Sequence, residues 1–569
     1  MPQFGAIDVV FLVGYLAITL WIGFAVGRRE RATVGDYFRA GNRLPWYAIG
    51  FSILAAGISS EQFVGEVGYA YKLGLPVANW EWLVFPALSL LLWVFVPIYV
   101  RNRVTTMPEY LELRYGPRAR TLYACLIIAS YVFANFALVF YTGGYAVEKL
   151  WGVNRLAVVW LLAAATGAYT VYGGLASVAW TDLFQGVLLM GGGIYVFVVG
   201  MARLGWDFTA IFAVADRSHL VAHHCPEVPW TAVVILGFST MTWYYANDQF
   251  INQRCLGAKN EWHAKMGVLL AAGLQLLLPL AVCFPGMIYH AINPDLSDSN
   301  AAYPMMVLEV VPAGLRGLVV AAVLGAIMST ISGLVNSTAT MATLDIFARW
   351  PGKSWDEKQL VRLGQWCGAA ALVIGALFAP VVMQWESIFR YCQDIWSPMA
   401  APAVVVFLGG ALWKGGRQRG AVACLWLSIL SVPLIFVKQF LADRGVHFLP
   451  PNLEDALIFS GGLFVASIAV LVALSVIRRF VSAAVVALVL GGLALALAAV
   501  NPAVIAALVA GSVVVGVAVF GVRAAPAPHL WDRSMLHLPP GQRVPWYASL
   551  WLWWAVAGLC FLGIYLYFW

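Results

Sequence analysis

Long apolar stretches alternate along this chain with short polar segments that are rich in arginine. A helix needs about 20 apolar residues to cross the roughly 30 Å hydrocarbon core of a bilayer. The chain predicts sixteen such spans, at residues 7–27, 45–71, 78–100, 121–148, 156–172, 176–202, 231–253, 266–290, 317–347, 363–382, 386–412, 420–441, 456–477, 480–500, 502–522 and 546–569. This pattern is typical of an all-α polytopic membrane protein.

Two of the predicted spans contain polar residues where apolar ones are expected. Segments 55–63 and 243–250 carry carboxylates and amides, and each of them ends in a Gln-Phe pair. Because the bilayer core offers no water to polar groups, such breaks persist only where they line a cavity. Matched breaks in two halves of a chain mark the substrate site of a transporter. The pattern therefore predicts a transporter whose site lies at these two breaks.

The order of the spans predicts two inverted repeats of five helices. The second and the seventh spans contain the polar breaks, and each is followed by four further spans. Because five is an odd number, the second set enters the membrane upside down relative to the first. We expect an N-terminal helix and basic loop at 1–44, a first repeat at 45–203, an outer loop at 204–230, a second repeat at 231–412, and peripheral helices at 413–569 that include an extra apolar hairpin at 480–522.

Composition and charge agree with a membrane protein and predict its orientation. Hydrophobic residues make up 62% of the chain and charged residues only 11%, against about a quarter in soluble proteins. Most of the 34 Lys and Arg residues fall in alternate loops, and such loops face the cytoplasm. We therefore expect a cell-membrane location with both termini extracytoplasmic. The net charge of +7 reflects the basic residues of the cytoplasmic loops and does not indicate binding of nucleic acid. The sequence does not indicate an obligatory protein partner.

A cluster of hydroxyl groups lies in the ninth predicted span. Ala326, Ser329 and Thr330 fall on one face of a helix, because residues three and four apart are neighbours. Sodium prefers hard oxygen ligands, which two hydroxyls and the carbonyls of an unwound neighbouring helix can supply. The alternative is that these small residues form ordinary helix–helix contacts and bond to their own helix.

A set of short motifs identifies the family that the chain resembles. The chain resembles the sodium/solute symporter family, and within it the sodium/glucose cotransporter branch, over residues 5–478 and 530–569. The motifs that carry the resemblance lie at residues 36–43, 55–68, 106–110, 172–175, 180–182, 248–249, 253–256, 285–287 and 329–345. The resemblance implies a core of two inverted repeats in which the sodium gradient drives uptake of a small solute.

The resemblance also implies which residues bind the coupling ion. A sodium site is expected at the carbonyls of Ala55, Ile58 and Ala326 and at the hydroxyls of Ser329 and Thr330. Thr330 replaces the commoner serine, which keeps the oxygen atom. Asp182 corresponds to a family position near a sodium route or a second sodium ion; a deeply placed carboxylate could equally pair with a backbone end.

The solute site implied by the resemblance is less complete. Gln62, Glu81 and Gln393 match residues that bond sugar hydroxyls, and Tyr244 matches the ring that closes the inner side of the site. Met241 stands where sugar carriers usually have asparagine, and Gln275 where they have lysine. The predicted lining has amides and acceptors but no Lys or Arg; its apolar walls are Trp80, Trp243 and Tyr244. This lining favours a neutral sugar or polyol.

Two alternatives to this function remain open. A sodium symporter for a small carboxylate or another nutrient, such as proline, pantothenate or sialic acid, fits the same fold, because an anion can bind the positive end of a broken helix. A sensor or passive channel on this fold also has binding residues. An enzyme is not expected, because the eight histidines are scattered without a nucleophile, base or metal cluster.

Overall fold

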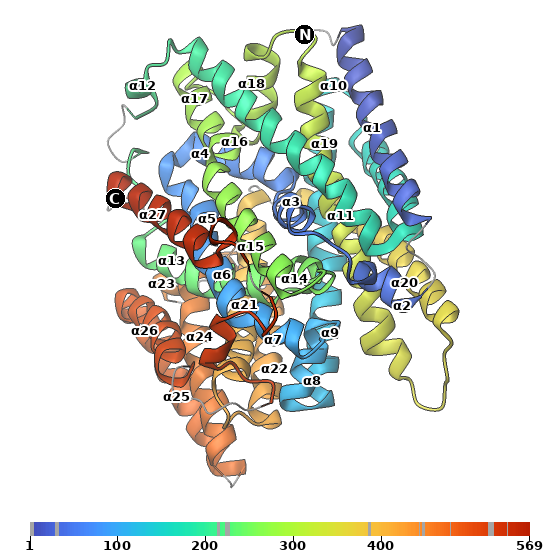
Figure 1. Cartoon of the computed structure of the whole chain (residues 1–569). Helices are drawn as coiled ribbons and strands as arrows, with labels where there is room; N and C mark the ends of the chain where they lie inside the picture. The colour runs from blue at the N-terminus through green and yellow to red at the C-terminus, as the bar shows by residue number, and fades with distance from the viewer. Residues whose placement is uncertain are drawn as a thin grey trace.

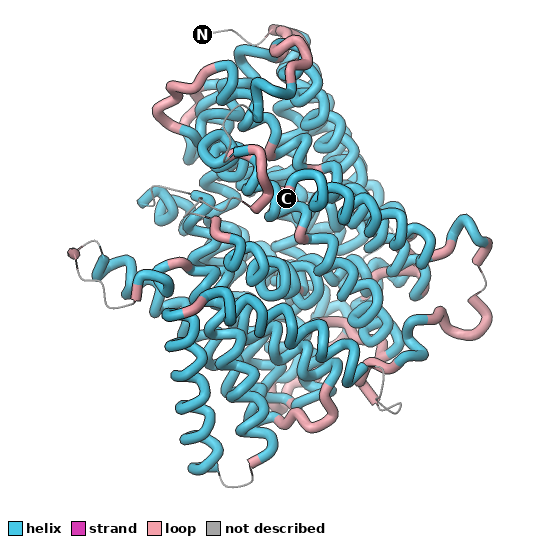
Figure 2. Tube along the Cα trace, turned by 90° about the vertical axis from the view of Figure 1, so that its left-hand side faces the viewer, coloured by secondary structure: helices cyan, strands magenta, loops and turns pink. Residues whose placement is uncertain are grey.

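The protein is built almost entirely from helices that pack lengthwise into a bundle (Figures 1 and 2). The computed structural model describes residues 5–28, 33–212, 217–221, 228–384, 388–442, 444–445, 450–477, 480–521, 528–542 and 544–569. Within these ranges no strand occurs, and one isolated bridge pairs Leu44 with Ala258. The all-helical expectation is confirmed.

Many of the helices are long and apolar enough to cross a membrane. The described residues contain ten such helices, or twelve when two bent pairs are each counted as one span. The main helices are α1 (Ala6–Gly27), α3 (Trp46–Gly57), α4 (Val67–Leu73), α6 (Val84–Leu90), α7 (Val96–Arg101), α9 (Pro117–Ser130), α10 (Phe136–Trp151), α11 (Arg155–Arg203), α14 (Gln249–Leu256), α15 (Glu261–Leu277), α17 (Phe284–Ile292), α19 (Arg316–Met341), α20 (Glu357–Phe378), α21 (Ile388–Leu412), α22 (Gln418–Ala442), α24 (Ala456–Val476), α25 (Phe480–Val500), α26 (Pro502–Val515) and α27 (Leu550–Phe568).

Helix α11 contains a sharp break at Gly174. Its 49 residues are too many for one span, and Gly174 has φ 60° and ψ −154°, a conformation that side chains strongly disfavour. A Cβ atom at this position would lie 2.3 Å from the carbonyl oxygen of Tyr37. Glycine is therefore required here for both conformation and space, and the break separates the spans predicted at 156–172 and 176–202.

Both spans with polar segments are broken in the structure. Helix α3 ends at Gly57, and Ile58 is extended with φ −113° and ψ 125° before the chain continues at an angle of 55°. The second break lies at Asp248, which has φ −77° and ψ 137° and caps the start of α14. Polar sequence inside an apolar stretch thus marks the places where the helices unwind.

Helix α19 lies at the centre of the bundle, and α1 and α27 lie at its edge. In the most apolar stretch of α19, 94% of the residues are buried, against 17% in α1 and 11% in α27. Helices α25 and α26 pack beside α24 at one end of the bundle (Figure 1). The two broken spans and α19 therefore meet in the interior, where they can enclose a site.

Candidate functional site

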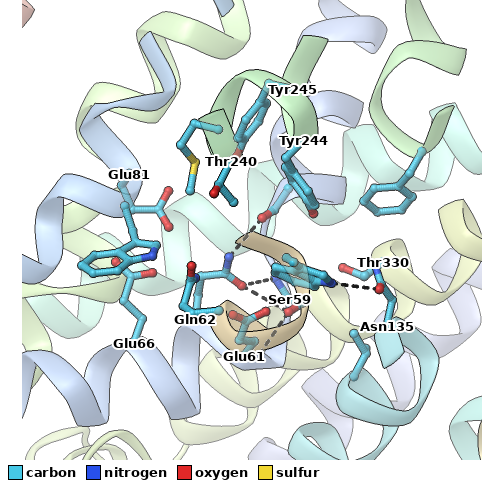
Figure 3. A pocket seen from close by; sticks show the side chains of 17 residues that line it. Ser59, Glu61, Gln62, Glu66, Glu81, Asn135, Thr240, Tyr244, Tyr245 and Thr330 are labelled. Carbon is cyan, nitrogen blue, oxygen red and sulfur yellow. Dashed lines mark hydrogen bonds between the residues drawn. The ribbon is translucent and has the colours of Figure 1, made fainter. Parts of the chain in front are cut away.

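A cavity lies between the two broken spans, close to α19 (Figure 3). About 50 Å³ of it is open to the centres of water molecules, so it accepts only a small molecule unless its walls move. Its lining includes Gly57 and Ser59 at the first break, Tyr244 and Tyr245 before the second break, and Thr330 from α19. The structure thus brings together segments that lie as far apart in sequence as Gly57 and Thr330.

Four π-helical turns contribute side chains to this cavity. They span Gln62–Glu66, Tyr131–Asn135, Leu236–Met241 and Trp243–Asn247. A π-helical turn inserts one extra residue per hydrogen-bonded turn and redirects the side chains that follow, and such turns are frequent at functional sites. These turns contribute the polar side chains of Gln62, Glu66 and Asn135 and the aromatic side chains of Tyr244 and Tyr245 to the lining.

Five oxygen atoms gather beside the cavity, where α19 contacts the broken end of α3. The Oγ atom of Ser329 lies 2.7 Å from the carbonyl oxygen of Ala55 and 2.9 Å from that of Ala326. The Oγ1 atom of Thr330 lies 3.2 Å from the carbonyl oxygen of Ile58 and 3.0 Å from that of Ala326. We call these five atoms the oxygen cage. In the structure both hydroxyls donate hydrogen bonds to their own helix and to α3, as the alternative reading expected. The same five hard, uncharged oxygens could also hold a monovalent cation, because the unwound backbone supplies part of the set.

The oxygen cage and the cavity share residues. Thr330 belongs to the cage and also lines the cavity, and the break at Ile58 separates the cavity residues Gly57 and Ser59. A cation that orders the Thr330 hydroxyl and the broken backbone therefore also orders one wall of the cavity. This shared wall gives a physical route by which ion binding can influence solute binding.

Gln62 lines the cavity, but its amide is already engaged by the broken helix. The Oε1 atom accepts a hydrogen bond of 2.7 Å from the backbone N–H of Ser59, and Nε2 donates one of 3.1 Å to the carbonyl oxygen of Gly57. These two bonds satisfy backbone groups that the break leaves without helical partners. Gln62 therefore stabilises the break. Only its second N–H group and the second lone pair of Oε1 can bond to a solute.

Glu81 reaches the cavity, whereas Gln275 lies behind it. Glu81 comes from the short helix α5 (Asn79–Trp82) and lines the cavity, and the Nε2 atom of Gln275 donates a hydrogen bond to its carboxylate. The same Nε2 atom lies 3.5 Å from the hydroxyl oxygen of Tyr245. The amide that replaces the expected lysine thus holds Glu81 in place from outside the lining.

We expect the Gln275→Leu substitution to weaken solute affinity by about tenfold while sodium affinity stays unchanged. A buried carboxylate oxygen that loses its donor costs about 1 to 3 kcal/mol, and Glu81 then shifts away from the solute. Gln275→Lys restores a donor and is expected to retain affinity. The measurement is the half-saturation concentration for solute and for sodium in reconstituted vesicles; equal losses for both ligands would contradict a positioning role at the solute.

Aromatic side chains form the other wall of the cavity. Tyr244 packs against Trp396 with ring centroids 5.8 Å apart, and Gln393 lies on the same helix as Trp396, one turn earlier. Trp243 was expected to be a further wall, but its ring is buried outside the lining and its Nε1 donates to the hydroxyl of Tyr123 at 3.2 Å. Met241 lines the cavity, so an apolar side chain faces the solute at this position.

Asp182 lies apart from the cavity and forms a buried ion pair. Its Oδ2 atom lies 2.5 Å from the hydroxyl of Ser52 and 3.1 Å from Nη2 of Arg254, and both charged side chains are at most 1% exposed. Arg254 comes from α14, directly after the second break. The charge of Asp182 is thus already balanced by a residue of the chain.

Comparison with known proteins identifies the family. The model of the sodium:solute symporter family matches residues 37–428. The chain belongs to the sodium:solute symporter family. The chain is 31% identical to the sodium/glucose cotransporter of Vibrio parahaemolyticus over 468 residues, which cover 76% of this chain and 85% of that protein. It is 32% identical over 463 residues to the sodium/myo-inositol cotransporter of Bos taurus, of which it spans 64%.

A solved structure supports the same fold. The structure of a Na⁺-coupled sialic acid symporter in its substrate-bound outward-open state covers 76% of this chain with a TM-score of 0.66 and 21% identity. Membership of the sodium:solute symporter family confirms a multi-pass membrane carrier, with sodium as the coupling ion and a small molecule as the solute. It also excludes an enzyme, because the relatives are sodium-coupled cotransporters.

Several lining residues were not predicted from the sequence. Glu66, Asn135, Thr240 and Tyr245 line the cavity together with the predicted residues. Glu66 alone gave a usable signal, since it is a carboxylate inside an apolar span and lies four residues after Gln62. The other three are inconspicuous in sequence, because polar or aromatic residues of their kind occur throughout the spans of this symporter.

Proposed function

We propose that this chain imports a small neutral polar solute, a sugar or a polyol, together with sodium by alternating access. The observation that carries the proposal is the shared wall, in which Thr330 and the broken end of α3 belong both to the oxygen cage and to the cavity. The sugar and polyol cotransporters among the relatives support the solute class.

In this proposal the two ligands have separate residues. Sodium binds the oxygen cage of Ala55, Ile58, Ala326, Ser329 and Thr330, whose five oxygens converge within hydrogen-bonding distance. The solute meets Gln62, Glu81, Gln393 and Tyr244 in the cavity, and Gln275 positions Glu81. A bound cation supplies positive charge to the broken backbone and draws α3 and α19 together. The solute itself is recognised by the side chains that line the cavity.

The proposed architecture has sixteen spans, two inverted five-helix repeats and both termini outside the cell. The first repeat comprises residues 45–203 and the second residues 231–412, and the two extended breaks, at Ile58 and Asp248, stand in corresponding spans of the two repeats. Both termini are placed outside because the basic loops then face the cytoplasm. The carrier works in contact with membrane lipid and without an obligatory protein partner.

A carrier for a small carboxylate is the second candidate, and the cavity disfavours it. Three glutamates line the cavity, and no Lys, Arg or His is found among the described residues of its lining. An anion would therefore meet a lining that contains several carboxyl groups. A sensor or a passive channel can be distinguished from a carrier only by measuring solute transport.

The test of the proposal is sodium-driven accumulation in proteoliposomes. We expect an inward sodium gradient to drive uphill uptake of at least one member of a panel of glucose, galactose and myo-inositol, and choline or potassium in place of sodium to abolish it. A channel would equilibrate the solute without accumulation, and a sensor would bind it without uptake. Accumulation that persists in choline would contradict sodium coupling, and accumulation of carboxylates alone would support the second candidate.

A further inference from the structure

Another cavity lies where the chain enters the first broken span and leaves the second. About 340 Å³ of it is open to the centres of water molecules, against about 50 Å³ in the solute cavity. Its walls come from three segments: residues 39–42 before α3, residues 99–104 at the end of α7, and residues 255–260 between α14 and α15. We call this cavity the basic pocket. It is large enough for a ligand of its own.

Three basic residues line the basic pocket, one from each segment. Arg39, Arg103 and Lys259 belong to its lining, and no Asp or Glu does so among the described residues. In the part of the chain that the structure describes, none of these three side chains forms an ion pair or a hydrogen bond. By contrast, Arg101 pairs with Glu261 at 2.8 Å. Three like charges around one hollow repel one another, so an anion is the ligand that this lining attracts.

Hydrogen bonds hold the walls of the basic pocket in place. The backbone N–H of Leu44 donates to the carbonyl oxygen of Gly257 at 3.0 Å, and that of Lys259 donates to the carbonyl oxygen of Leu44 at 3.1 Å. The Nδ2 atom of Asn42 donates to the carbonyl oxygen of Leu256 at 3.2 Å. These bonds join the segment before α3 to the segment after α14. The backbone that carries the basic side chains is therefore positioned before a ligand binds, which lowers the cost of binding.

Tyr99 connects the basic pocket with the second break. It lines the pocket, and its hydroxyl donates to the carbonyl oxygen of Ala246 at 3.2 Å. The Nδ2 atom of Asn247 lies 3.5 Å from the same hydroxyl oxygen. Ala246 and Asn247 directly precede Asp248, where the second span breaks. A ligand in the basic pocket therefore contacts a residue that also holds the broken span.

We propose that the basic pocket binds a phosphate group, at a site separate from the solute cavity. A phosphate monoester carries about two negative charges at pH 7, so it suits three cations better than a carboxylate with one charge does. The guanidinium groups of Arg39 and Arg103 can each donate two parallel hydrogen bonds to its oxygens, and Lys259 adds a compact charge. In the orientation proposed above the pocket faces the cytoplasm, where the phosphate belongs either to a soluble ester or to the headgroup of an anionic lipid.

Titration calorimetry on the purified protein in detergent tests for a soluble ester. The ligands are inorganic phosphate, glucose 6-phosphate and glucose, all measured without sodium so that the transport cycle is not engaged. We expect glucose 6-phosphate to bind at least about tenfold more tightly than glucose, because only the ester meets the three charges. Added salt should weaken this binding, since the basic side chains are accessible to solvent.

A lipid source is tested by the thermal unfolding midpoint in mixed micelles. Phosphatidic acid has a phosphate monoester headgroup, and phosphatidylcholine is the matched lipid whose phosphate is neutralised by choline. If the ligand is a lipid, phosphatidic acid raises the midpoint of the parent protein relative to phosphatidylcholine, because a ligand that binds the folded state stabilises it. Either response, to the soluble ester or to the lipid, supports a phosphate site.

Variants assign the binding to the basic pocket. Arg39→Gln and Lys259→Gln each remove one charge, and we expect each to weaken the phosphate response by at least about threefold. Arg118→Gln is the matched control, because Arg118 is an exposed basic residue of α9 outside the pocket, and its response should equal that of the parent. Absence of any response to phosphate, glucose 6-phosphate and phosphatidic acid overturns the inference, as does an equal loss in all three variants. None of these measurements uses sodium or uptake, so failure here leaves the proposed sugar transport standing.

Discussion

Replacing Ser329 by alanine is expected to raise the sodium concentration for half-maximal uptake by at least about tenfold. The hydroxyl of Ser329 lies 2.7 Å from the carbonyl oxygen of Ala55, and it is one of only two side-chain oxygens in the oxygen cage. Loss of one contact to a charged ligand costs about 1.5 to 3 kcal/mol, and 1.4 kcal/mol corresponds to a factor of ten. The measurement is initial solute uptake as a function of external sodium.

A neighbouring serine provides the matched control. Ser332 is also buried in α19, and its hydroxyl bonds the carbonyl oxygen of Ser329 within the same helix at 2.9 Å. Ser332→Ala therefore removes the same atoms without touching α3, and its sodium dependence should resemble that of the parent. If Ser329→Ala and Ser332→Ala behave alike, the hydroxyls serve only helix packing and the oxygen cage is not the sodium site.

Local sequence was sufficient to predict where the helices break. Polar residues at 55–63 and 243–250 interrupt apolar runs, and the extended residues Ile58 and Asp248 lie within these segments. The prediction succeeds because the cost of polar groups in a bilayer is local and does not depend on the rest of the fold. The same reasoning placed Ser329 and Thr330 on one face of α19, which needs only the period of a helix.

Sequence was insufficient where the site depends on redirected helices. Glu66 and Thr240 line the cavity from the π-helical turns at Gln62–Glu66 and Leu236–Met241, and such turns cannot be recognised from residue type alone. The commitment of Gln62 to the backbone of the break and the withdrawal of Gln275 behind Glu81 also depend on tertiary contacts. Residue type predicted the polarity of the site, but not which polar atoms remain available to a solute.

Asp182 illustrates how one tertiary partner changes an interpretation. The sequence left a second sodium and a pairing with backbone as alternatives, and the structure instead places Arg254 against the carboxylate. A further cation at Asp182 would have to displace the guanidinium. We therefore expect the Hill coefficient of uptake against sodium concentration to be the same in Asp182→Asn as in the parent protein. A lower coefficient in the variant would support a second sodium ion at Asp182.

Replacing Arg254 by methionine is expected to destabilise the protein strongly. Arg254 and Asp182 are at most 1% exposed, and the substitution leaves a buried carboxylate without its partner. Removal of one member of a buried ion pair lowers the free energy of unfolding by about 3 to 5 kcal/mol. The measurement is the thermal unfolding midpoint of the purified protein in detergent.

The double variant separates the unpaired charge from the loss of packing. Asp182→Asn combined with Arg254→Met removes both charges, so it should be more stable than Arg254→Met alone, because no buried carboxylate remains unbalanced. Lys149→Met serves as the control, since the side chains of Lys149 and its partner Asp298 are 42% and 43% exposed, and such pairs contribute about 0 to 1 kcal/mol. A double variant no more stable than Arg254→Met would show that the arginine acts through its packing against Phe250 and not through Asp182.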